Sequence, residues 1–359
     1  MAKSICLFNH KGGVSKTTTA FNLGWSLANK DMRVMLVDLD SQCNLTGIVL
    51  GFDACRDDID LENFYNNRYN LTMESIVESL INGNSPDSFL TNNQGKLTKT
   101  LNENLFLLPG HLDVADLDSQ ISVSLKIAAG VPATKNIPGN LPKLLNSIAE
   151  KNNIDYILYD LSPNVGGLNE IILMSSDYFI VPTSPDFFCW QAVGSLSKNI
   201  KKWHGELKFF KENNGFIDIN YAIKNNPKFI GTVQQRYRPR NGSPAKSFEK
   251  WIDRIKSEVT SSFVPMLKNI GCVIDEDKIK NILLSEGAEL KPYDLAHIAD
   301  FNSLIAISQE YRVPIFSLTK AQIKDAGQFG HALETMDQSK DKFELEFNAL
   351  ADRVIKLTS

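Results

Sequence analysis

Two glycines and two lysines lie close together near the start of the chain, in the stretch SICLFNHKGGVSKTTTAFNLG (residues 4–24). A short apolar run precedes them and helical apolar spacing follows, which predicts a strand, a tight turn and a helix. The backbone N–H groups of such a turn and the positive end of the helix dipole bind anions. Gly12 and Gly13 expose those groups, and Lys16 is placed to reach phosphate oxygens. The stretch therefore predicts a phosphate-binding loop.

The loop departs from the general phosphate-loop pattern, in which glycine precedes the lysine, because Ser15 occupies that position. Serine is favoured immediately before a helix, so we expect Ser15 to be the helix N-cap, with its side chain turned away from the phosphate. An ordinary strand–helix turn and a loop that has lost nucleotide binding remain alternatives. The residues expected to hold the nucleotide are Lys11, Gly12, Gly13, Val14, Ser15, Lys16, Thr17 and Thr18.

Acidic residues end two further apolar runs. Asp38 and Asp40 close RVMLVDLD (residues 33–40), and Asp160 lies in YILYDLSP (residues 156–163). If the first strand continues to its end, its two acids point to opposite faces of the sheet. A carboxylate at the end of a strand either caps the following turn or serves a site at that edge of the sheet.

The stretch KGGVSKTTTAFNLG (residues 11–24) resembles the deviant Walker A motif K-G-G-x-G-K-[ST] of ParA/MinD-type ATPases. RVMLVDLDSQCNLT (residues 33–46) is similar to the second motif of that family, V-D-x-D-P-Q-x-N. Residues 156–186 are similar to its Walker B strand, the loop after it and the next strand. Together these blocks cover roughly half of the chain in the family's order, and the departures are Ser15 for glycine and Ser41 for proline.

The resemblance implies that Mg²⁺ and ATP are the cofactors. Lys16 and the loop amides would hold the β- and γ-phosphates, and Thr17 would ligate the metal. Asp160 would hold the metal through water, Asp38 would lie near the metal shell, and Asp40 would lie beside the attacking water. Two strand-end residues are expected near the adenine base, namely Pro182 and Gln235.

Lys11, the additional lysine of the deviant motif, has a separate role in this family. The resemblance implies that it reaches across a two-fold axis to the phosphates of the partner's nucleotide, where it neutralises charge. The chain is therefore expected to form a homodimer with ATP sandwiched between the subunits. A solvated lysine beside an anion site is the alternative. The implied catalytic residues are Lys11, Lys16 and Asp40, and the implied metal-site residues are Thr17, Asp38 and Asp160.

Apolar runs of strand length alternate with helical patterns along the chain. Besides residues 5–9 and the two runs that end in acids, NLFLLPG, YFIVPTSP and KFIGTVQQ read as strands. This alternation predicts an α/β fold, a mostly parallel twisted sheet with helices on both faces. We expect one P-loop ATPase domain over residues 1–359, with an inserted lobe at 53–104, a proline-rich loop at 130–142 and a C-terminal helix at 338–357 packed on the body.

The charge balance excludes a strong overall attraction to nucleic acid, because 38 basic residues face 42 acidic ones. The five cysteines include no C-x-x-C pair, which excludes a disulfide framework and a cysteine-ligated metal. No apolar run approaches the ~20 residues that span a bilayer, and the acids of the C-terminal helix argue against a membrane surface. We therefore expect a cytoplasmic protein with no membrane partner.

Basic residues gather locally in the segment at 236–256. ParA proteins bind DNA without sequence preference, so we expect a DNA-binding role for Arg236, Arg238, Arg240, Lys246 and Lys250, with a solvated face as the alternative. The predicted function is a slow, dimerising ATPase that partitions DNA or positions another cargo, stimulated by a ParB-like or other protein partner. Such a protein would associate with the nucleoid. A nucleotide-switched regulatory protein that binds a protein partner and no DNA is the second hypothesis.

Overall fold

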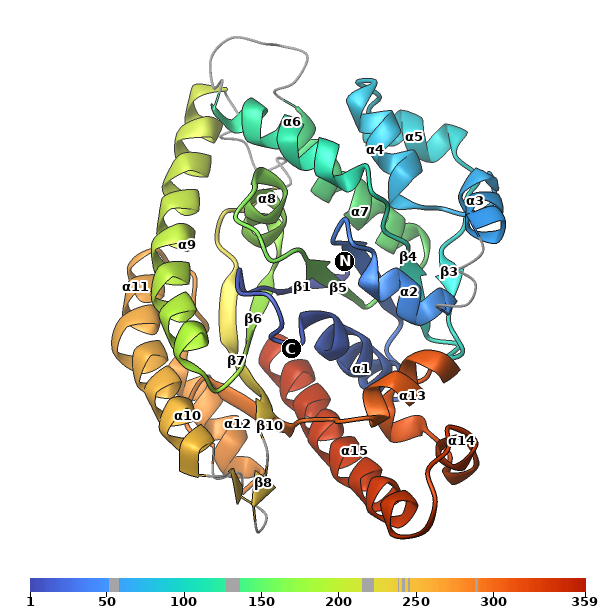
Figure 1. Cartoon of the computed structure of the whole chain (residues 1–359). Helices are drawn as coiled ribbons and strands as arrows, with labels where there is room; N and C mark the ends of the chain where they lie inside the picture. The colour runs from blue at the N-terminus through green and yellow to red at the C-terminus, as the bar shows by residue number, and fades with distance from the viewer. Residues whose placement is uncertain are drawn as a thin grey trace.

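A twisted sheet crosses the centre of the molecule with helices on both of its faces, in a computed structural model (Figure 1). The structure describes residues 1–51, 58–126, 136–214, 223–237, 239–240, 243–244, 246–287 and 290–359. Eight strands form this sheet within those ranges, in the order β10-β7-β6-β1-β5-β2-β4-β3. Its strands are β1 (Lys3–Leu7), β2 (Val34–Leu39), β3 (Thr98–Lys99), β4 (Leu105–Leu108), β5 (Tyr156–Leu161), β6 (Tyr178–Thr183), β7 (Lys228–Tyr237) and β10 (Asp294–Ala299).

The strands pair in parallel except at one edge, where β3 runs antiparallel to β4. Every residue of β2 and β5 is buried, as expected for strands covered on both faces. The predicted α/β fold with a mostly parallel sheet is therefore confirmed. A separate two-stranded hairpin joins β8 (Pro239–Arg240) and β9 (Ser243–Pro244).

Helices α1 and α15 pack together on one side of the sheet, and α6, α7 and α8 pack together on the other (Figure 1). The helices before residue 180 are α1 (Lys16–Ala28), α2 (Asn44–Leu50), α3 (Asp58–Asn66), α4 (Met73–Ile81), α5 (Pro86–Asn92), α6 (Val114–Lys126), α7 (Ile137–Lys151) and α8 (Gly167–Ser175). The later ones are α9 (Phe187–Asn213), α10 (Lys246–Glu258), the π-helix η1 (Val259–Phe263), α11 (Val264–Asn269), α12 (Glu276–Ser285), α13 (Leu304–Tyr311), the 3₁₀ helix η2 (Ile315–Ser317), α14 (Lys320–Asp325) and α15 (Gly330–Thr358).

All six strands expected from apolar runs are present, whereas two strands of the sheet were not predicted, the two-residue β3 and the longer β10. The sequence of β10, DLAHIA, contains two polar residues, and the structure shows why they are tolerated. Asp294 is 2% exposed and pairs with Lys256 at 2.7 Å and with His297 at 2.8 Å. The prediction of a loop at residues 130–142 is wrong for residues 137–142, because helix α7 begins at Ile137 and contains Pro142. Residues 127–135 lie outside the described part.

The C-terminal helix α15 begins at Gly330, eight residues before the predicted start. Its apolar stripe is buried against α1, β10 and η2, and consists of Phe343, Phe347, Leu350, Val354 and Leu357. Phe301 and Phe316 pack on this stripe: the ring of Phe301 meets Phe343 edge-on with centroids 4.8 Å apart, and the centroid of Phe316 lies 5.9 Å from that of Phe347. None of the helices in the described part of the chain is both long and apolar enough to span a bilayer.

Glu170, on α8, is a buried carboxyl group away from the sheet edge that carries the acids. It is 6% exposed, and its Oε1 atom has no hydrogen-bond partner among the described residues. Burial raises the pKa of Glu170 to about 8, and the nearby carboxylate of Glu206 is the second cause of this increase. The folded protein therefore favours the protonated form of this side chain.

We predict that Glu170→Gln becomes increasingly more stable than the wild type as pH rises. Because the folded-state pKa of about 8 exceeds the unfolded value of about 4.3, protons stabilise the native chain. That stabilisation is complete below the pKa that Glu170 has in the unfolded chain. It is lost as pH rises from there through the pKa that Glu170 has in the folded chain. Chemical denaturation between about pH 5 and pH 8 measures the gap in unfolding free energy. The exposed Glu150→Gln serves as control, and a gap independent of pH would contradict the prediction.

Candidate functional site

The loop between β1 and α1 has the backbone of an anion-binding turn. Gly13 and Ser15 both adopt positive φ angles, 72° and 60°, and helical hydrogen bonding begins where Thr19 N donates to Ser15 O at 2.9 Å. Ser15 stands at the N-cap position, but its side chain makes no capping hydrogen bond. The expected N-cap position is therefore confirmed, whereas the side-chain capping bond for which serine is favoured there is absent. The turn requires a left-handed residue here, a conformation that glycine adopts without strain and serine adopts at a cost.

Lys16 is buried at the first position of α1, with only 7% of its surface exposed. Its Nζ donates to Asn9 O at 3.1 Å, on the other side of the turn. Burial lowers the pKa of Lys16, while the nearby carboxylates of Asp160 and Asp40 act in the opposite direction. A cation held in this way beneath a turn of backbone amides is complementary to phosphate.

Asn9 organises the loop, and sequence reasoning gave it no role. Its Oδ1 accepts from Lys11 N at 3.0 Å, and its Nδ2 donates to Pro182 O at 2.9 Å. These bonds tie the first residues of the loop to the end of β6. A polar residue between an apolar strand and a glycine-rich turn was the available signal, but its partner is distant in sequence.

The strand pairing brings the predicted metal-site acids together. Asp38 on β2 and Asp160 on β5 are register partners of adjacent parallel strands, so their side chains share one face. Asp160 is 1% exposed, and neither of its carboxylate oxygens has a hydrogen-bond partner within the described ranges. Burial, and after it the charge of Asp38, raise the pKa of Asp160 to about 8. The neighbouring Thr17 and Lys16 act in the opposite direction and lower this pKa.

A buried carboxylate without partners is costly unless a cation completes it. Two unpartnered oxygens beside the threonine hydroxyl form the hard oxygen set that Mg²⁺ prefers. Asp160 and Thr17 therefore fit a magnesium ion.

Asp38 and Asp40 are held differently from each other. Asp38 is fully buried and accepts hydrogen bonds from Thr46 N at 2.8 Å and from Thr46 Oγ1 at 2.7 Å. Burial is the main reason that the pKa of Asp38 is raised to about 6. Asp40 follows the end of β2, donates its N–H to Asp38 Oδ1 at 3.2 Å, and accepts from Gln42 N at 3.1 Å. A turn after the strand, rather than strand alternation, therefore sets the direction of Asp40. Thr46 lies within the second motif, yet sequence reasoning gave it no role.

Lys11 is paired within its own chain. Its Nζ lies 2.6 Å from Asp186 Oδ2, and the two side chains are 23% and 41% exposed. Asp186 is also the N-cap of α9, where its Oδ1 accepts from Cys189 N at 2.9 Å. The structure therefore places this lysine at the surface beside the loop, held by an acid that sequence reasoning missed.

The two residues expected near adenine lie at the carboxyl ends of neighbouring strands, and both are buried. Pro182, on β6, uses its carbonyl to bind Asn9. Gln235, on β7, donates from Nε2 to Thr19 Oγ1 at 2.6 Å, and its Oε1 is unpartnered among the described residues. Gln235 thus connects β7 to the helix that follows the loop.

The predicted DNA-binding residues are dispersed. Arg236 is exposed, yet its Nη1 donates to Gly13 O at 2.9 Å, so it contacts the phosphate loop. Lys246 and Lys250 are exposed on α10, one helical turn apart. Arg238 lies outside the described residues, and the side chain of Arg240 in β8 is likewise not described.

Comparisons with known proteins agree with this geometry. The chain is 28% identical to the chromosome partitioning protein ParA of Caulobacter vibrioides over 224 residues, 62% of this chain and 70% of that protein. It is 28% identical to the sporulation initiation inhibitor protein Soj of Bacillus subtilis over 201 residues, 56% and 66% of the two chains. The structure of Cyanothece McdA in complex with ATP shares the fold, with a TM-score of 0.59 at 14% identity over 98% of this chain and 96% of that one.

A family model described as an AAA domain matches residues 2–211, which is more than half of the 359 residues. The matched region contains the phosphate loop, both acid-bearing strands and the acid that holds Lys11. The chain belongs to this family, as a P-loop ATPase of the ParA/MinD type.

Proposed function

We propose that this protein is a slow ATPase that binds Mg-ATP, dimerises with the nucleotide between its subunits, and partitions DNA or positions another large cargo. The observation that carries the proposal is the buried carboxylate of Asp160, which has no hydrogen-bond partner within the described ranges and lies close to Lys16. The name of the Caulobacter relative, a chromosome partitioning protein, supports the cargo.

The residues divide the chemistry between them. The loop amides and Lys16 bind the phosphates, and Thr17 and Asp160 hold Mg²⁺, which supplies Lewis-acid stabilisation of phosphoryl charge when bound. Thr46 fixes Asp38 beside this pair through its two hydrogen bonds. Asp40 is assigned to orient the attacking water, because it lies at the same sheet edge and is held by backbone N–H of the following turn.

Dimerisation is assigned to Lys11. Its ion pair with Asp186 is only partly buried, and such a pair contributes little net free energy, so it can be exchanged for phosphate oxygens. A lysine released in this way provides positive charge where the partner's nucleotide is negative.

A second function is favoured by one observation. Arg236 donates one hydrogen bond to Gly13 of the phosphate loop, which ties one member of the proposed basic face to the nucleotide site. A nucleotide-switched protein that binds a protein partner and no DNA would need no such face. DNA retention separates the two functions.

The serine of the loop is compatible with nucleotide binding. We predict that Ser15→Gly changes ATP affinity by less than about tenfold, ~1.4 kcal/mol, because glycine reproduces the left-handed turn. Lys16→Ala should abolish tight binding, since it removes the buried cation. Isothermal titration with Mg-ATP measures both. A wild type without ATP binding that Ser15→Gly restores would show that the natural loop has lost this activity.

We predict that replacing Lys11 and replacing Asp40 block different steps of the ATPase cycle. Lys11→Ala should bind ATP but lose hydrolysis and weaken the ATP-dependent dimer. Asp40→Ala should keep ATP and the dimer but lose turnover, because only the attacking water is disturbed. Phosphate release and size-exclusion chromatography with Mg-ATP, with ADP and without nucleotide measure the two properties. Turnover and dimerisation of Lys11→Ala equal to the wild type would refute the assignment.

DNA binding is tested with the exposed lysines of α10, which lie apart from the loop. Lys246→Ala/Lys250→Ala should weaken DNA retention in Mg-ATP on all sequences alike and flatten its salt dependence, because each lysine releases counterions. The matched control, Lys324→Ala/Lys342→Ala, removes two exposed charges from α14 and α15. Gel shifts at two salt concentrations measure the effect. No ATP-dependent retention even at low salt would favour the protein-partner function.

A further inference from the structure

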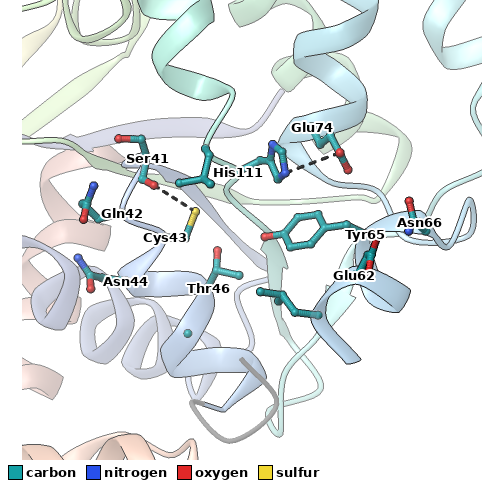
Figure 2. Close-up of a pocket in the computed structure, with 13 residues that line it drawn as sticks. Ser41, Gln42, Cys43, Asn44, Thr46, Glu62, Tyr65, Asn66, Glu74 and His111 are labelled. Atoms are coloured by element: carbon teal, nitrogen blue, oxygen red, sulfur yellow. Dashed lines mark hydrogen bonds and ion pairs between the residues drawn. The ribbon is translucent and has the colours of Figure 1, made fainter. Parts of the chain in front are cut away.

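A cavity of about 670 Å³ lies between α2 and α3, next to the segment that carries Asp40 (Figure 2). We call it the α2–α3 pocket. Residues of the turn and helix after Asp40 form one wall, including Ser41 and Thr46, and Glu62 and Tyr65 of α3 form the facing wall. Its volume falls in the range of small-molecule sites, about 300–1,000 Å³. The site described above leaves this cavity unused.

Hydrogen bonds connect the pocket walls to the acids of the ATPase site. Thr46, in the pocket wall, donates its hydroxyl to Asp38 and accepts from Gly110 N at 2.8 Å. The hydroxyl of Tyr65, in the opposite wall, donates to Gly110 O. Gln42, also in the wall, donates its backbone N–H to Asp40. The two walls are thus joined through one residue, Gly110, and both acids receive bonds from residues that line the pocket.

The lining sets the chemistry of the occupant. Glu62 and Glu74 provide carboxylates, and the described lining residues include no lysine or arginine. Leu61, Leu112 and the ring of Tyr65 add apolar surface. A cation on a short apolar body satisfies both features, since carboxylates bind guanidinium and ammonium groups and the apolar surface is removed from water.

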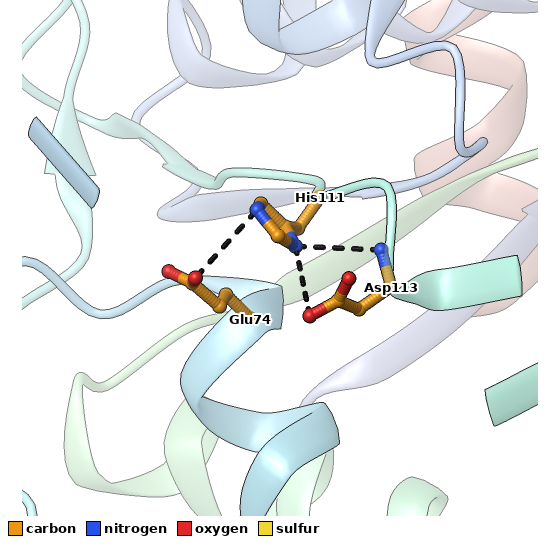
Figure 3. Close-up of side chains that lie close together, drawn as sticks. All are labelled: Glu74, His111 and Asp113. Atoms are coloured by element: carbon orange, nitrogen blue, oxygen red, sulfur yellow. Dashed lines mark hydrogen bonds and ion pairs between the residues drawn. The ribbon is translucent and has the colours of Figure 1, made fainter. Parts of the chain in front are cut away.

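His111 lies beside one of these acids. Its Nε2 lies 3.6 Å from Glu74 Oε1, and its Nδ1 lies 3.3 Å from Asp113 Oδ2 (Figure 3). The ring packs against Tyr65 with centroids 5.0 Å apart. Nδ1 of the same ring also accepts from Asp113 N at 3.3 Å, so the imidazole lies between the two carboxylates in the lining of the pocket.

We propose that the α2–α3 pocket is a regulatory site for a guanidinium or amine group on a short apolar chain, and that its occupant accelerates hydrolysis. The occupant draws α3 toward α2 by pairing with Glu62 and Glu74. That movement tightens the hydrogen-bond chain from Tyr65 through Gly110 and Thr46 to Asp38 and orders the turn that holds Asp40. A free metabolite and the side chain of a partner protein share this chemistry.

Binding is measured first, by calorimetric titration of the nucleotide-free protein with butylguanidinium and with its uncharged isostere butylurea. We expect the cation to bind and butylurea to bind at least about tenfold more weakly, because only the cation pairs with carboxylates. Glu62→Gln/Glu74→Gln should weaken the cation's binding by at least about tenfold. Glu78→Gln, exposed one turn further along α4, is the matched control and should bind as the wild type does.

A second variant guards against misfolding of the double mutant. Leu112→Trp fills the pocket from a side chain that is 67% exposed, so it leaves the core intact and should also abolish binding. A short peptide, acetyl-Gly-Arg-Gly-amide, distinguishes the sources: stronger binding of the peptide indicates a partner's side chain, and stronger binding of the free cation indicates a metabolite. Absence of cation binding, equal binding of butylurea, or binding unchanged by the glutamate and tryptophan variants would overturn the site.

The proposed acceleration of hydrolysis rests on the proposed ATPase activity, and it is measured separately from binding. Saturating butylguanidinium should raise the rate of phosphate release at least about twofold in the wild type. Tyr65→Phe keeps the ring and removes the hydroxyl, so it should retain binding and lose the acceleration. Binding without any change in rate would overturn the regulatory role and leave the ATPase in place. A wild type with no hydrolysis would refute the proposed function, while the titration would still decide the site.

Discussion

The carboxylate of Asp160 is the constraint on which the site depends. It is buried in the middle of the sheet with neither oxygen hydrogen-bonded in the described structure, and Asp38 lies beside it in register. Two like charges in a low-dielectric interior repel one another, and each loses its hydration. The protein offsets this by placing Lys16 nearby and by leaving an oxygen-lined position open to a divalent cation. Cation binding and completion of the fold are therefore linked at this point.

Contacts from distant parts of the chain shape the phosphate loop. His10 bonds to Ser195 at 2.8 Å, Lys11 pairs with Asp186, and Arg236 donates to Gly13. Ser195 lies on α9, Asp186 is the N-cap of that helix and Arg236 lies on β7, so elements distant in sequence hold the loop.

Sequence patterns predicted the parts of this structure that depend on local composition. Buried strands between two layers of helices are continuous apolar runs, and a glycine-rich turn before a lysine has few other uses, so both could be recognised. The strand β10 could not, because its buried Asp294 is tolerated only through Lys256 and His297, which no local pattern reveals.

The same limit explains the errors within the site. Ser15 follows a preference that holds for ordinary helix starts, but the turn fixes a left-handed backbone that overrides it. Asn9, Thr46 and Asp186 owe their roles to partners on other elements, and only the folded chain brings these together.

The position of β1 has a consequence for how the molecule assembles. This first strand lies between β5 and β6, so its hydrogen bonds form only after residues 156–183 have been synthesised. Pairing across such separations is slow, because loop-closure entropy is lost before the contacts form. A nascent chain thus carries its apolar first strand without a partner until about half of the 359 residues have been synthesised. Chaperones that shield exposed strands are therefore expected to act on its N-terminal segment, and the phosphate loop takes its shape late in folding.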